Sequence, residues 1–122
     1  MKVNEIYSFA ELDTELRRLC DDLNGAVADL KTAGRDWAEK ENAYRRAKSV
    51  AYLNAEGTIP ERAAKVDKVC DAERLAAHIA EAEREACRER VHALKSQLSA
   101  FQTLARMNLV EAEMSRAPQP SW

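Results

Sequence analysis

The fold is decided by residues 37–60, which read WAEKENAYRRAKSVAYLNAEGTIP. This stretch holds the densest mixture of basic and aromatic side chains and the clearest reversal signal in the chain. Gly57 suits a helix end, Thr58 and Glu61 have the spacing of a capping box, and Pro60 suits a first helical turn. We therefore expect one long helix to end here and a second helix to begin.

The first helix is predicted from a regular apolar line that precedes the turn. Its positions alternate steps of four and three, and Lys40 is the one polar exception: Leu12, Leu16, Leu19, Leu23, Ala26, Leu30, Ala33, Trp37, Lys40, Tyr44, Ala47 and Ala51. Such spacing is typical of a coiled-coil seam. Ser8 and Glu11 have the spacing of a capping box, and Tyr7 could pack against Leu12 as a hydrophobic staple. The helix is therefore expected over 9–55.

Two glycines weaken this first helix, because each costs about 1 kcal/mol relative to alanine inside a helix. A break at Asn24 and Gly25 is one interpretation. The alternative is a continuous helix, which we favour because the heptad spacing runs unbroken across Gly25 and Gly34.

The second helix is predicted over 60–116, after a turn at 56–59. Its expected apolar positions contain a stutter between Ala86 and Val91: Val66, Val69, Leu75, Ile79, Ala82, Ala86, Val91, Leu94, Leu98, Phe101, Ala105 and Ala112. Large apolar residues after Val91 cover more than one face of the helix. Their apolar surface is larger than a two-helix hairpin can bury.

The predicted fold class is therefore all-α, a long antiparallel helical hairpin resembling a coiled coil. One hairpin domain over 9–116 lies between an N-terminal arm, 1–8, and an irregular tail, 117–122. We expect it to form a homo-oligomer through the apolar stem opposite the turn. The expected interface residues are Leu12, Leu16, Leu94, Leu98, Phe101, Leu104 and Met107.

Composition narrows the function classes. The 122 residues carry a net charge of -2, so the overall charge favours neither a nucleic-acid coat nor a membrane surface. No apolar run approaches the roughly 18 residues that a membrane helix needs. The odd number of cysteines, Cys20, Cys70 and Cys87, argues against a disulfide framework and predicts an intracellular protein with reduced thiols.

Catalytic and metal-binding patterns are weak. The two histidines, His78 and His92, are fourteen residues apart, and Cys87 lies five residues before His92, which suits different helix faces rather than one metal ion. No phosphate-binding glycine loop or nucleophile elbow is found. The prediction is a protein without catalytic activity, metal or cofactor.

The basic residues near the turn are the main functional clue, because only residues 31–68 carry more basic than acidic side chains. The candidate nucleic-acid-binding residues are Lys40, Arg45, Arg46, Lys48, Arg62, Lys65 and Lys68. In an oligomer they would form a positive track for phosphates. The alternative is that their stems cover apolar surface. Trp37 and Tyr44 could stack on bases, but core packing is favoured for both.

A resemblance adds to this interpretation. A series of residues and short segments follows this order along the chain: Trp37, Tyr44, Arg46-Ala47-Lys48, Tyr52-Leu53, the glycine turn, Ala93-Leu94-Lys95-Ser96 and Met107. This pattern resembles the UvsY family of phage recombination mediators over residues 37–110. The resemblance implies a helical, ring-forming protein of the bacterial host cytoplasm that binds single-stranded DNA. It implies partners, namely a RecA-type recombinase and single-strand-binding protein, and a DNA contact at Arg46 and Lys48. The acidic first thirty residues depart from that family.

The sequence therefore predicts a non-enzymatic accessory protein for single-stranded DNA that resembles a recombination mediator. The alternative is a coiled-coil adaptor, scaffold or small inhibitor. It would act through protein contacts made by the apolar surface between Phe101 and Met114.

Overall fold

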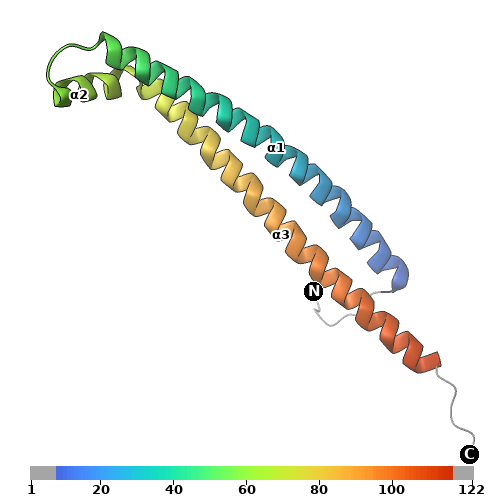
Figure 1. Ribbon diagram of the computed structural model, residues 1–122. Helices are drawn as coiled ribbons and strands as arrows, with labels where there is room; N and C mark the ends of the chain where they lie inside the picture. Colours follow the sequence, from blue (N-terminus) through green and yellow to red (C-terminus); the bar gives the residue numbers. More distant parts are fainter. Residues whose placement is uncertain (1–7, 117–122) are drawn as a thin grey trace, which may run out of the picture. The chain divides into compact units, whose positions relative to one another are not determined.

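The computed structural model describes residues 8–116, which form three helices: α1 over Phe9–Asn54, α2 over Ile59–Val69 and α3 over Asp71–Arg116 (Figure 1). The helices α1 and α3 run in opposite directions and pack together, which confirms the predicted all-α hairpin. The expectations for the arm before Ser8, including the Tyr7 contact, and for the tail after Arg116 lie outside the described residues.

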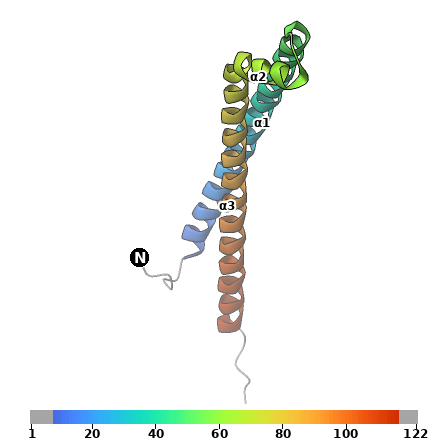
Figure 2. The ribbon, with the colours of Figure 1, turned by 90° about the vertical axis from the view of Figure 1, so that its left-hand side faces the viewer.

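Two compact units divide the chain. One joins the segment up to Gly25 to the segment from Val91 onward, and the other spans Ala26–Arg90. Within the second unit, Figures 1 and 2 both show the end of α1 beside α2 and the start of α3. Within residues 8–116, none of the helices is both long and apolar enough to cross a membrane.

The first helix confirms the prediction to within one residue at its end. It is continuous across Gly25 and Gly34, so the expected continuity is also confirmed. At its start, the Ser8 amide donates to the Glu11 carboxylate over 3.2 Å, and the Glu11 amide donates to the Ser8 hydroxyl over 3.1 Å. This reciprocal pair satisfies two amides that the first turn leaves without helical partners.

The predicted α1 seam is buried or half-buried at every apolar position, with Leu12, Leu19 and Ala26 most deeply covered. Lys40, the polar exception, is exposed. In the unit that contains the two chain ends, Leu12 and Leu19 of α1 and Val91 of α3 are buried. This confirms that the leucine-rich start of α1 packs beside the end of α3.

The prediction of one helix over 60–116 is wrong at Cys70, where α2 and α3 are separated. Cys70 has φ -97° and ψ 13°, outside the helical region, although its amide still donates to the Val66 carbonyl over 2.9 Å. Both Val66 and Cys70 are buried, with 3% and 1% of their surfaces exposed. The bend therefore lets α2 bury an apolar face that a straight helix would direct elsewhere.

The predicted seam of α3 is also wrong before Val91. Leu75, Ile79, Ala82 and Ala86 are exposed, and no stutter occurs. The inward positions keep strict steps of four and three: Glu73, Ala77, Ala80, Arg84, Cys87, Val91, Leu94, Leu98, Phe101, Ala105, Asn108 and Ala112. Because Trp37 and Tyr44 fill the α1 side of the seam, the small side chains of Ala77 and Ala80 suit the opposite side.

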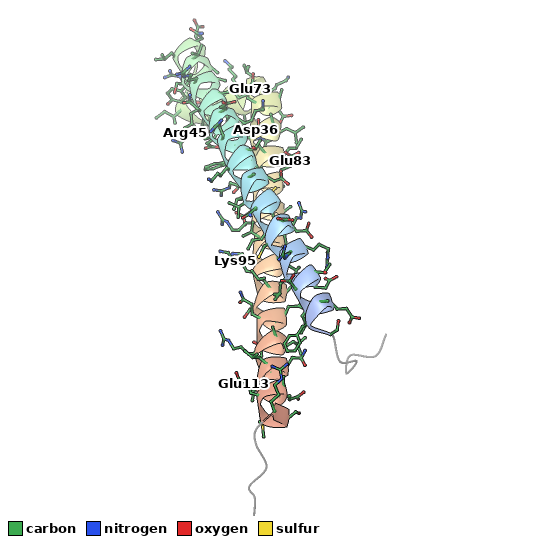
Figure 3. The ribbon with its side chains drawn as sticks, turned by 90° about the vertical axis from the view of Figure 1, so that its right-hand side faces the viewer. Asp36, Arg45, Glu73, Glu83, Lys95 and Glu113 are labelled. Atoms are coloured by element: carbon green, nitrogen blue, oxygen red, sulfur yellow. The ribbon has the colours of Figure 1, made fainter. Side chains whose placement is uncertain are left out.

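The surface of both long helices is covered by charged side chains at helical spacing. Figure 3 shows Asp36 and Arg45 on α1 and Glu73 and Glu83 on α3. Most ion pairs in the described part join residues three or four apart, whereas Arg90 of α3 reaches Asp29 of α1 over 3.3 Å. Exposed ion pairs of this kind contribute little to stability, so the two helices are held together mainly by the apolar contacts of the seam.

Candidate protein-docking groove at the helical turn

The turn between α1 and α2 is held by its local sequence. Gly57 adopts φ +114°, a backbone conformation that favours glycine, and is followed by the Thr58 cap. The Glu61 amide donates to the Thr58 hydroxyl over 3.4 Å, and the Thr58 amide donates to the Glu61 carboxylate over 3.3 Å. The predicted capping box and glycine stop are therefore both confirmed.

Two basic side chains of α2 donate hydrogen bonds to backbone carbonyls at the end of α1 and in the turn that follows it. The Arg62 guanidinium donates to the Tyr52 carbonyl over 2.8 Å and lies 4.3 Å from the centre of the Tyr52 ring. The Lys65 ammonium donates to the Glu56 carbonyl over 2.7 Å. The last turn of α1 has no basic residue of its own, so α2 supplies the positive charge that a helix C-terminus favours.

The other predicted nucleic-acid-binding residues fall into two groups. Lys40 and Arg45 face acidic neighbours on α1, because Lys40 lies 3.8 Å from Asp36 and Arg45 lies 3.3 Å from Glu41. Lys48 lies 5.8 Å from the centre of the Tyr44 ring. Among the described residues, Arg46, Lys48 and Lys68 are exposed and form no ion pair.

The two aromatic residues of the seam are partly covered by the protein itself. Trp37 and Tyr44 are half-buried, which agrees with core packing. The Arg84 guanidinium of α3 lies 4.2 Å from the centre of the Trp37 ring and thus covers one of its faces. The apolar spacing does not predict this cation-π contact, because it counts only apolar side chains and therefore leaves Arg84 out of the seam.

An open groove of about 640 Å³ lies between the end of α1 and α2. We call it the tip groove, and its lining residues are Arg46, Ala47, Val50, Ala51, Asn54, Ala55, Lys65 and Val69. Its wall is mostly apolar, with Val50 57% and Val69 69% exposed. Among the described residues, Arg46 and Lys65 are the only charged ones that line it.

The apolar character of this end of the hairpin was also missed. Leu53 and Ile59 are 80% and 72% exposed on either side of the turn, beyond the groove itself. Val50, Leu53 and Ile59 lie off the seam in the sequence, and that excess of apolar residues was the signal that could have identified this surface.

The predicted oligomer interface divides into two sets. Leu12 is buried, and Leu16, Leu94, Leu98 and Phe101 are half-buried within the unit that contains the chain ends. Leu104 and Met107 are 42% and 56% exposed. A second hollow, of about 320 Å³, is lined by Leu16, Gln102, Ala105, Arg106 and Leu109. Assignment of these residues to an oligomer interface stays a prediction.

The described residues contain no cluster of three or more histidine, cysteine or acidic side chains that could hold a metal ion. His78 and His92 are exposed, and Cys87 is half-buried in the seam. In comparisons with known proteins, no family model, no curated protein and no solved structure matches the chain.

Proposed function

We propose that the chain is a non-enzymatic helical adaptor whose tip groove binds an acidic amphipathic helix of a partner protein. The observation that carries the proposal is an exposed apolar groove with cations on its lining. Its alanine and valine residues would accept the apolar side chains of a helix that lies along it. Arg46 and Lys65 would attract carboxylates on the flanks of that helix.

The state of the two cations supports this choice of partner. Arg46 is exposed and forms no ion pair in the described residues, so its charge is available. Lys65 uses one donor on the Glu56 carbonyl, and an ammonium group has three. A neutral apolar helix would leave both charges beside an apolar surface without compensation, whereas an acidic flank would pair with them.

The groove is also held in shape before any partner binds. The capping box, the Gly57 turn and the Arg62 contact with Tyr52 fix α2 against the end of α1. A groove that is already formed avoids part of the entropy cost of ordering a binding surface. This supports a docking role over a purely structural role for the turn.

The experiment uses the full chain and a labelled designed peptide with leucines on one helical face and glutamates on the other, measured by fluorescence anisotropy. We expect Val50→Glu to weaken binding at least about tenfold, because it places a charge in the groove wall and repels the glutamates. Ala43→Glu is the matched control, since Ala43 is exposed on α1 outside the groove.

A second peptide separates charge from apolar contact. In it lysines replace the glutamates, and we expect it to bind more weakly than the acidic peptide. Equal binding of both peptides would show that the cations do not select the partner. Unchanged binding by Val50→Glu would remove the tip groove as the docking site.

Binding of single-stranded DNA is the second candidate function, as in the recombination mediators that the chain resembles. Its specific support is the group of Arg46, Lys48 and Lys68, which are exposed near the turn without ion pairs in the described residues. Arg62 and Lys65 contribute less to such a surface than the sequence predicts, because backbone carbonyls already occupy them. A RecA-type recombinase and single-strand-binding protein are the proposed partners in this case.

Labelled oligothymidine tested across a salt series distinguishes the two candidates. Phosphate binding would fall steeply with salt and would be lost in Arg46→Ala combined with Lys48→Ala. Peptide binding through the groove would depend on Val50 and be little affected by Lys48→Ala. Absence of oligothymidine binding at low salt would exclude the DNA function.

A further inference from the structure

The helix α3 carries a second apolar line, on the side turned away from its seam. Its members follow steps of three and four and are all exposed; we call them the outer stripe: Ala72, Leu75, Ile79, Ala82 and Ala86. The last four each lie two positions after a seam residue, which is about 200° around a helix with 3.6 residues per turn. Leu75 and Ile79 are 59% and 52% exposed.

The same positions on α1 are mostly polar. Two residues beyond the seam in the unit that spans Ala26–Arg90, α1 presents exposed polar side chains between Ala28 and Leu53, namely Thr32, Arg35, Glu39, Asn42, Arg46 and Ser49. The outer stripe is therefore a property of α3 and not of the general surface composition. Between Ala28 and Leu53, these positions of α1 form no apolar line that could cover the outer stripe in a second copy.

We infer that the outer stripe pairs with the outer stripe of a second copy, with the two α3 helices antiparallel. A two-fold axis between Ile79 and Ala82 places Leu75 opposite Ala86 and Ile79 opposite Ala82 of the other copy. Each large side chain then meets a small one, as close packing of two helices requires. A parallel pair would place Leu75 on Leu75 and leave the alanines facing each other across a gap.

Charges beside the stripe agree with this arrangement. His78 and Glu85 lie on the same flank of the stripe, and antiparallel pairing places His78 of each copy near Glu85 of the other. On the other flank, Glu83 would face Ala76 and meet no like charge. Glu89 occupies the next position of the line and ends the stripe with a charge.

The inference is independent of the proposed function, because the outer stripe and the tip groove share no residue. It also differs from the stem interface that the sequence predicts. A dimer formed in this way would carry two tip grooves, so a partner with two acidic helices would bind with increased avidity.

Sedimentation equilibrium of the full chain over a range of concentrations tests the inference. We expect a species with twice the 13.7 kDa mass of the chain, and a monomer for Ile79→Glu. Ala38→Glu, on an exposed position of α1, is the matched control and should remain dimeric. Circular dichroism checks that each variant keeps its helical content.

Mixed variants test the direction of pairing. In the antiparallel arrangement, residue 79 of one copy faces residue 82 of the other, so mixing Ile79→Glu with Ala82→Lys should restore a dimer that neither variant forms alone. Restoration by Ile79→Glu with Ile79→Lys instead would overturn the antiparallel pairing. A wild-type chain that stays monomeric, or a dimer that dissociates on Met107→Glu but not on Ile79→Glu, would overturn the outer stripe as the interface.

Discussion

Gly57 is the residue at which a single methyl group has the greatest predicted effect on the turn. An added Cβ would clash with the capping carboxylate of Glu61, and φ +114° is strained for any L side chain. We expect Gly57→Ala to lower the free energy of unfolding by about 1 to 3 kcal/mol. Urea denaturation, monitored by circular dichroism, measures this change in the free energy of unfolding.

Gly25→Ala is the matched control for that change. Gly25 lies inside α1 with no atom within 4 Å of the added Cβ, so the same methyl group should stabilise the chain by about 1 kcal/mol. Opposite signs for the two glycines are the expected result. A stabilising Gly57→Ala would show that the turn does not hold the described backbone conformation in solution.

Arg62 is the second residue with a structural role that its charge alone does not reveal. Arg62→Gln removes the guanidinium donor to the Tyr52 carbonyl and the contact with the Tyr52 ring. We expect a loss of about 1 to 3 kcal/mol in the free energy of unfolding. Lys68→Gln, an exposed position on α2 with no ion pair in the described part, should change stability by less than about 0.5 kcal/mol. Equal effects would mean that Arg62 acts only through its charge.

At the scale of the helix, the two long elements differ in how well their sequence predicts them. The first helix follows its largest apolar residues, and its limits and continuity were predictable from Leu12 to Ala51. In the first half of α3, Leu75 and Ile79 are exposed, whereas Ala77 and Ala80 are buried. Spacing alone could not choose between these two lines, because both have steps of three and four. The choice depends on the aromatic residues that α1 brings to the seam.

A pair of alanine substitutions tests which line of α3 is buried. Ala80→Leu adds three heavy atoms at a position that is 2% exposed, and we expect it to destabilise the chain by about 1 to 3 kcal/mol. Ala82→Leu adds the same atoms at an exposed position and should be near neutral in dilute solution. Thermal unfolding at low protein concentration compares them. The reverse order of stabilities would favour the sequence-based seam.

For the whole molecule, the all-α hairpin was predictable and the docking surface was not. The capping boxes, Gly57 and the α1 seam each depend on residues near one another in sequence, where local rules apply. The tip groove depends on where α2 lies, and that follows from the bend at Cys70, which no proline or glycine marks. The sequence predicts Arg62 and Lys65 as ligand-binding cations, and it does not show their carbonyl partners, Tyr52 and Glu56, because these lie across the turn.

The contact between Arg84 and Trp37 has a consequence for how the two long helices are aligned. A seam with a heptad repeat presents corresponding positions every seven residues, so a slip of one helix past the other by a heptad is the competing alignment. Such a slip would set Arg84 against Leu30 or Tyr44 and leave the Trp37 face uncovered. The guanidinium already has its Nε atom buried without a hydrogen-bond partner, which makes a less favourable neighbour costly. Arg84 therefore helps to select one alignment of α1 and α3, in addition to the pairing of large with small side chains in the seam.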